Sequence, residues 1–163
     1  MGQYVSLHNH TVHSLMDSLI TPTQLFDKVK ELGQPAVAIT DHGTLFSAWD
    51  AWKASKKTGV KLLMGCEFNF VDNVQENQSP RHVILIAKNH QGYKNLLNIN
   101  KISFDNLLGG TKKVVPQIDW QVLEDNSEGL ICTTACSGGI LGQLINTRRS
   151  AEAFTQAQRL QSI

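Results

Sequence analysis

Three short apolar runs in the first half of the chain are each followed closely by side chains that bind metal ions in proteins. The runs cover residues 4–7, 36–40 and 60–64, and the residues that follow them are His8, His10, Asp41, His42 and Glu67. Residues two apart in an extended chain point to the same side, so His8 and His10 can reach one ion together. Asp17 lies in the same loop as this pair. Three such runs in succession indicate an active site.

The residue types at these positions favour particular metals. Imidazole, carboxylate and thiolate suit zinc and related transition ions, whereas calcium and magnesium favour oxygen ligands alone. Two histidines and a carboxylate form a common catalytic zinc set that leaves room for water. A second cluster that shares the carboxylate would fit hydrolysis of phosphoesters by two ions roughly 3.5–4 Å apart. Asp41 could accept a hydrogen bond from a ligand or lie on the opposite face, and the sequence leaves both open.

The apolar runs alternate with segments of helical spacing. We expect strands at 3–7, 36–40, 60–64, 83–87 and 130–134, and helices near 22–32, 45–58, 92–103, 118–125, 139–146 and 150–161. Thr21 can cap the first helix, with Pro22 in its first turn and Gln24 completing a capping box. This alternation predicts an α/β fold with a largely parallel sheet, either barrel or open. In both forms, sites gather at the carboxyl ends of the strands.

The three cysteines have different expected roles. Cys66 precedes Glu67 and points to the other side of its strand, so we expect a core thiol. Cys132 lies within an apolar run and is likewise expected in the core. Cys136 ends that run before Ser137-Gly138-Gly139, where it is a reasonable metal ligand and otherwise a free thiol. An odd number of cysteines without regular spacing predicts no disulfide framework.

Other candidate residues are harder to place. His82 opens a strand, which is the wrong end for a ligand in a simple parallel βα unit, and His90 lacks a supporting pattern. Helical spacing predicts that Phe46, Trp49 and Trp52 lie in the core, although they could instead form a base-stacking platform.

Bulk properties narrow the function further. The 163 residues suffice for one globular core, and a net charge of +1 argues against binding nucleic acid by bulk charge. There is no pattern of a secretory signal and no apolar stretch approaching the roughly 18 residues of a membrane span. We therefore expect a soluble, cytoplasmic protein without a membrane partner.

The ligand-bearing motifs resemble those of the polymerase-and-histidinol-phosphatase (PHP) superfamily. They read Ser6-Leu7-His8-Asn9-His10-Thr11 with Ser14 and Asp17, then Ile39-Thr40-Asp41-His42-Gly43, then Gly65-Cys66-Glu67. The segments 82–89 and 92–96 point more narrowly to the N-terminal PHP domain of the C-family replicative polymerases, the alpha subunits of bacterial DNA polymerase III. Residues 130–139 are similar to that family's next signature. The resemblance covers nearly the whole chain.

The resemblance implies a distorted (β/α)7 barrel with up to three zinc or manganese ions. One ion would be held by His8, His10 and Glu67, a second by Glu67, His82 and Cys136, and a third by Asp17 and His42. His82 thereby becomes an expected ligand. The implied activity is metal-dependent 3′–5′ exonuclease proofreading at the primer 3′ end of DNA, with the rest of the polymerase and the replisome subunits as partners.

One departure from the family pattern concerns the C-terminus. The family's last motif, an aspartate and a histidine close together, is absent, so we expect residues 1–163 to be a PHP domain fragment without its final barrel strands or the polymerase active site. The alternatives are a phosphoesterase of the histidinol-phosphatase type, against which the 82–96 segment argues, and a structural module whose metals brace a polymerase.

Overall fold

The computed structural model describes residues 4–76, 78–108 and 115–163, which contain four strands and six helices. The strands are β1 (Ala36–Ile39), β2 (Lys61–Phe70), β3 (Arg81–Ala87) and β4 (Leu130–Thr133). The helices are α1 (Pro22–Glu31), α2 (Ala48–Thr58), α3 (His90–Leu108), α4 (Trp120–Asp125), α5 (Ile140–Asn146) and α6 (Ser150–Ser162). The predicted α/β fold is confirmed, and each of these elements overlaps a segment expected from the sequence.

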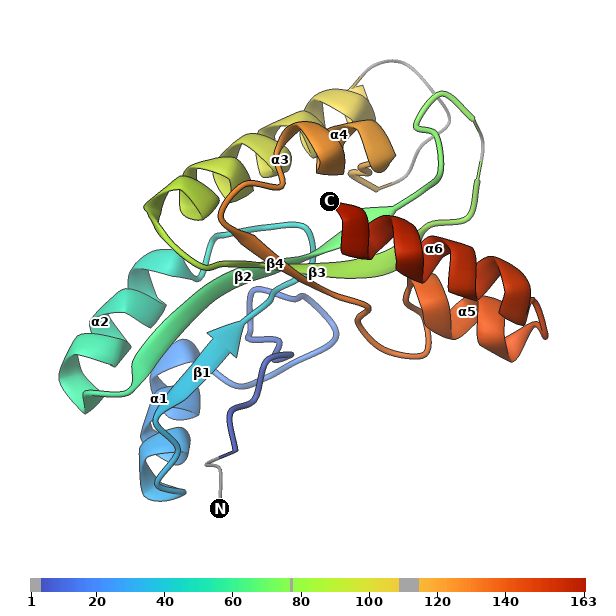
Figure 1. Cartoon of the computed structure of the whole chain (residues 1–163). Helices are drawn as coiled ribbons and strands as arrows, with labels where there is room; N and C mark the ends of the chain where they lie inside the picture. Colours follow the sequence, from blue (N-terminus) through green and yellow to red (C-terminus); the bar gives the residue numbers. More distant parts are fainter. Residues whose placement is uncertain (1–3, 77, 109–114) are drawn as a thin grey trace.

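The four strands form one sheet in the order β1-β2-β3-β4 (Figure 1). Only β1 and β2 are parallel, because β2–β3 and β3–β4 are antiparallel pairs. The expectation of a largely parallel sheet is therefore wrong for these strands. A parallel connection needs a crossover, usually a helix, and no helix forms in the described part of 71–80. The chain turns back directly, and β3 runs against β2.

The expected strand at 3–7 is reduced to a single parallel bridge between Ser6 and Val37, and residue 3 lies outside the described residues. His8 and His10 consequently stand in a loop that runs along the end of β1. Asn9, between them, fixes this loop: its side chain donates to the Ala38 carbonyl at 2.9 Å, and its backbone N–H donates to Thr40 Oγ1 at 3.0 Å.

The two faces of the sheet have different surroundings. Cys66, Phe68 and Phe70 alternate on one face of β2 and belong to the main apolar core, which α3 and α4 help to form. Glu67 points to the other face and lies opposite Ile84 of β3. Ile84 and Ile86 form a small separate apolar cluster with Ala38 on that face. The alternation of strand side chains therefore separates a helix-covered core from a face that carries the carboxylate.

The helices surround this sheet: α1 and α2 lie at the β1 end, α3 and α4 over the middle, and α5 and α6 at the far end (Figure 1). The capping box of α1 is confirmed, since Thr21 Oγ1 accepts from the Gln24 N–H and the Gln24 side chain accepts from the Thr21 N–H. Within the described residues, no helix combines the length and apolar character needed to cross a bilayer.

The predicted core position of the α2 aromatic residues is wrong. Phe46, just before α2, is 72% exposed, Trp49 is 65% exposed and Trp52 is 47% exposed. The helix instead buries its small residues Ala51 and Ala54 against α1 and β1, because these allow close packing. Trp49 and Trp52 stack on each other, with ring centroids 5.1 Å apart.

The predicted core position is correct for one of two cysteines. Cys66 is buried, as expected, whereas Cys132 is exposed and not a core thiol. Cys132 lies on β4, which pairs only with β3 among the described strands, so this apolar run lacks a neighbour on one side.

The start of α3 depends on a close backbone contact that only glycine permits. A Cβ atom at Gly92 would lie 1.8 Å from the carbonyl oxygen of Gly129, just before β4. We expect Gly92→Ala to lower the free energy of unfolding by about 1–3 kcal/mol, because overpacking forces the backbone apart. Urea denaturation measures this loss. The neighbouring exposed substitution Gln91→Ala should stay within about 0.5 kcal/mol of the wild type; equal stability of both variants would contradict the contact.

Candidate metal centre

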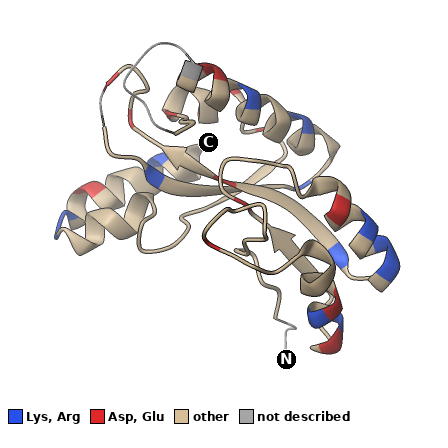
Figure 2. Ribbon diagram, turned by 180° about the vertical axis from the view of Figure 1, so that it is seen from behind, with Lys and Arg blue, Asp and Glu red and all other residues tan. Residues whose placement is uncertain are grey.

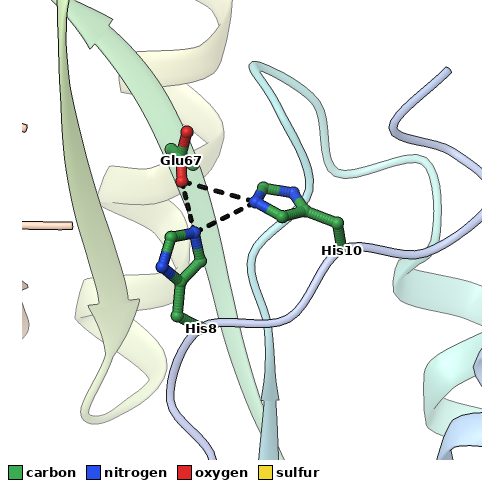
Figure 3. A group of neighbouring side chains, drawn as sticks. All are labelled: His8, His10 and Glu67. Atoms are coloured by element: carbon green, nitrogen blue, oxygen red, sulfur yellow. Dashed lines mark hydrogen bonds and ion pairs between the residues drawn. The ribbon is translucent and has the colours of Figure 1, made fainter. Parts of the chain in front are cut away.

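The Glu67 carboxylate is the centre of the site. Its side chain is only 1% exposed, and four imidazole rings surround it. The nitrogen–oxygen distances are 2.5 Å for His8 Nε2, 3.4 Å for His10 Nε2, 3.1 Å for His42 Nδ1 and 2.7 Å for His82 Nδ1. Figure 3 shows His8 and His10 reaching from the N-terminal loop toward Glu67 on β2. Two loops and two strands thus meet at one buried carboxylate.

The carboxylate oxygens are short of hydrogen-bond donors despite these contacts. Both oxygens of Glu67 are buried, and neither has an aligned hydrogen-bond donor among the residues that the structure describes. An ionised carboxylate buried in this way is costly unless a positive charge compensates it. His8 Nε2 and His10 Nε2 are 3.0 Å apart and face the same oxygen. A cation bound between these atoms would satisfy all three.

The backbone brings His42 to this carboxylate. His42 and Glu67 form a parallel bridge, in which the Glu67 N–H donates to the Asp41 carbonyl at 3.1 Å and the Gly43 N–H donates to the Glu67 carbonyl at 2.8 Å. The end of the β1 segment therefore continues alongside β2 up to the ligand positions. His42 follows the end of β1, as the sequence pattern predicted. Glu67 was expected just past a strand at 60–64, but β2 continues to Phe70 and carries Glu67 within it.

His82 reaches the site because β3 is antiparallel. The first residues of an antiparallel strand lie at the same end of the sheet as the last residues of its neighbour. His82 pairs with Asn69, two residues beyond Glu67, so both side chains share a face. The sequence argument that His82 opens its strand at the wrong end assumed a parallel sheet and is overturned by this topology.

Asp17 and His42 form a second, more open group with His10. His42 Nε2 is 3.2 Å from Asp17 Oδ2, and His10 Nε2 is 3.8 Å from the same oxygen. The ligand atoms of this trio lie within 4.8 Å of one another, as do those of His8, His10 and Glu67. Because His10 belongs to both groups, the two sites would be adjacent.

Cys136 lies at the edge of the site. Its Sγ is 4.0 Å from His82 Nδ1 and receives the N–H of Gly138 at 3.4 Å. A parallel bridge between His82 and Gly139 holds this loop against β3. Cys136 does not belong to either trio of described ligand atoms within 4.8 Å of one another, although it lies next to His82. All seven residues predicted as ligands thus lie in one region. Six of them contact one another around Glu67 or Asp17, and Cys136 lies beside them, next to His82.

Asp41 is not among the ligands. Its carboxylate is buried beneath the first ligand loop and accepts from the Thr11 N–H at 2.6 Å and from the Ser14 hydroxyl at 2.9 Å. The sequence left open whether Asp41 accepts a hydrogen bond near the ligands or lies on the opposite face. In the structure it accepts hydrogen bonds from the ligand loop. Thr11 and Ser14 are part of the first motif, but the sequence assigned them no role, because hydroxyl groups four or fewer residues from a histidine are common and carry no ligand signal of their own.

The carboxylate and the imidazoles shift each other's pKa values. Burial alone would raise the pKa of Glu67, but the neighbouring His10, His42 and His82 outweigh it and hold that pKa well below its usual range. The Glu67 carboxylate raises the pKa of His82 to about 9, against a lowering by burial. The same carboxylate raises the pKa of His42. Without a metal, protons therefore supply the positive charge that the site attracts.

Comparison with known families decides the assignment of the chain. A family model described as the PHP domain matches residues 6–163. The chain belongs to the PHP domain family.

Relatives of this PHP domain come from much longer proteins. The chain is 38% identical over 159 residues to the DNA polymerase III subunit alpha of Borreliella burgdorferi, covering 93% of this chain and 14% of the relative. It is 37% identical over 150 residues to that of Aquifex aeolicus, covering 84% and 12%. The chain thus spans between about one eighth and one seventh of the length of these relatives. A solved structure of a candidate metal-dependent phosphoesterase from Bifidobacterium adolescentis covers 98% of this chain and 56% of its own, with 25% identity and a TM-score of 0.46.

The pKa of His82 predicts how the metal-free PHP domain responds to pH. Since its pKa is raised from 6.5 to about 9, the stabilisation from protonated His82 is complete below pH 6.5 and is lost as the pH rises through 9. Thermal unfolding in a chelator should show a falling melting temperature across this window. His82→Gln should flatten this loss, and parallel curves for both proteins would contradict the coupling of His82 to Glu67.

Proposed function

We propose that this chain is the metal-dependent phosphoesterase domain of a C-family replicative DNA polymerase, and that it removes nucleotides from the primer 3′ end. The similarity to polymerase III alpha subunits supports the parent protein. The observation that carries the chemistry is the buried Glu67 carboxylate, whose oxygens lack aligned donors while four imidazole nitrogens approach them. A bound cation would replace the protons that otherwise balance the charge of this carboxylate, because protons and metal ions compete for the same nitrogen atoms.

The donor atoms fit zinc or manganese. Imidazole nitrogen and carboxylate oxygen are ligands of both ions. His8, His10 and Glu67 would hold one ion, Asp17 and His42 a second with His10 alongside, and Glu67, His82 and Cys136 a third. When bound, such ions activate water for attack on a phosphoester and neutralise charge on the phosphorus oxygens. The chain's own part is to gather the ligands on a rigid sheet end and to keep Glu67 shielded from solvent.

The distribution of charge supports recognition of phosphate through bound ions. Within the described residues, Lys and Arg are distributed over several helices, among them α1, α2, α3 and α6 (Figure 2). A protein of net charge +1 has little bulk attraction for DNA, so local cations would supply most of the positive charge that a phosphate meets.

The wider context follows from the same proposal. The four observed strands would be part of a larger (β/α)7 barrel, in which a further strand pairs with the edge of β4. The carboxylate-bearing face would then be the barrel interior. The remainder of the polymerase and other replisome subunits would be the partners, in the cytoplasm.

Two other functions compete with this one. A phosphoesterase of the histidinol-phosphatase type would use the same ligands on small phosphate monoesters. A structural module would use the metal only to brace a polymerase. The resemblance of residues 82–96 to the polymerase family, together with the similarity to polymerase III alpha subunits, favours the polymerase context over the small-molecule phosphatase.

Hydrolysis and metal content test the proposal together. The purified chain, equilibrated with zinc or manganese and freed of excess ion, should retain metal by elemental analysis and release nucleoside monophosphates from a mismatched primer. His10→Ala and Glu67→Gln should lower the hydrolysis rate at least about 100-fold, because even supporting residues of metal sites contribute about 10–100-fold. His90→Ala is the matched control, since His90 is exposed at the start of α3.

The outcomes separate the three functions. Activity on sugar or amino-alcohol phosphates with none on DNA would favour the phosphatase. A chain that binds metal, hydrolyses nothing and unfolds in a chelator would favour the bracing role. Absence of metal in the wild type and in Glu67→Gln alike would refute the ligand assignment itself.

A further inference from the structure

The Ser14 hydroxyl lies where the two ligand loops meet. Its Oγ is 2.9 Å from Asp41 Oδ1, 3.1 Å from His10 Nδ1 and 3.1 Å from the backbone nitrogen of His42. The residue is 1% exposed, so water does not compete at these contacts. One buried oxygen therefore touches the ring of one candidate ligand and the backbone of another.

Counting protons determines the direction of each hydrogen bond. Asp41 already accepts from the Thr11 N–H at 2.6 Å and from the Thr11 hydroxyl at 2.9 Å, the arrangement of an ionised acceptor. Two oxygens 2.9 Å apart need a proton between them, and an ionised carboxylate has none, so the single Ser14 proton points to Asp41. The His42 N–H can only donate to Ser14. With its proton used, Ser14 Oγ can only accept from His10 Nδ1.

We propose that Ser14 is a positioning residue that selects the tautomer of His10. A neutral imidazole carries one proton, so a proton held on Nδ1 leaves Nε2 with a free lone pair. Nε2 is the atom that faces both Glu67 and Asp17, at 3.4 Å and 3.8 Å. Asp41, through Ser14, thereby presents His10 ready to bind a cation. This role rests on the metal site of the proposed function.

The contact with His10 distinguishes this role from a purely structural one. The bonds from Ser14 to Asp41 and from His42 to Ser14 would suffice to hold the loop. The third contact, to the ring nitrogen remote from the ligand cluster, affects only the chemistry of His10. Such outer partners of metal-binding histidines typically contribute about 10–100-fold to metal affinity.

The test compares Ser14→Ala with Ser6→Ala in the full chain. Ser6 is the matched control, because its hydroxyl bonds to the Asn9 side chain in the same loop instead of to a candidate ligand. In the metal-free, ¹⁵N-histidine-labelled protein, long-range ¹H–¹⁵N spectra identify the His10 tautomer where the ring is neutral, with His10→Gln assigning the signal. We expect the Nδ1–H form in the wild type and in Ser6→Ala, and a shift to Nε2–H in Ser14→Ala.

Zinc affinity, measured by competition with a chelating dye, provides the second readout. Ser14→Ala should bind about 10–100-fold more weakly than the wild type, and Ser6→Ala should bind like the wild type. An Nε2–H tautomer in the wild type overturns the proposal even if Ser14→Ala fails to fold. Unchanged tautomer and zinc affinity in a folded Ser14→Ala also overturn it. An Nδ1–H wild type that binds no zinc supports the role of Ser14 in setting the tautomer and refutes the proposed function alone.

Discussion

A buried carboxylate within β2, that of Glu67, determines how the candidate site is arranged. Removing Glu67 from water costs free energy that hydrogen-bond donors or positive charge nearby must offset. Four imidazole nitrogens lie within 3.4 Å of the Glu67 oxygens. The N-terminal loop, the segment after β1 and β3 contribute these rings. A protonated ring or a bound cation can each supply the charge, and the two compete for the same nitrogen atoms. The affinity of the site for protons and its proposed affinity for metal therefore have the same cause, the negative charge of the buried carboxylate.

Much of this site could be predicted from the sequence, because most of its ligands lie within a few residues of a strand that the sequence also predicts. Each of three apolar runs is followed within a few residues by its ligand, and strand ends that share a sheet edge bring such residues together. The capping box at Thr21 and Gln24 likewise needs only four consecutive residues. His82 could not be placed this way, since its position depends on whether β3 runs with β2 or against it. That direction follows from the lack of a helix in the described part of the connection between the two strands, which is a weak signal in a polar segment.

The aromatic residues before and within α2 show a second limit of sequence reasoning. Trp49 and Trp52 have the spacing of a buried stripe, and helical periodicity by itself does not say which stripe packs inward. In the structure the alanine stripe takes that place, because Ala51 and Ala54 let α2 approach β1 and α1 closely. Similarly, Cys132 sits in an apolar run that predicts burial, but burial also requires a neighbour beyond β4. The spacing of apolar residues therefore predicts a helix or a strand more readily than it predicts which neighbouring elements bury its side chains.

The two candidate ligand groups differ in their exposure to solvent, so we expect them to differ in how firmly each would hold a cation. The inner group is built on Glu67, whose side chain is 1% exposed, whereas the outer group uses Asp17 at 50% and His42 at 40%. Charge interactions are stronger where water is excluded, so a cation in the inner group would be held more firmly than one in the outer group. Under the proposed function, the more exposed outer group would be the one that a DNA phosphate reaches first. His10 belongs to both groups, so the orientation of its ring affects the two together. The buried Asp41–Ser14 pair beneath that ring is therefore placed where a small change in hydrogen bonding would alter both groups together.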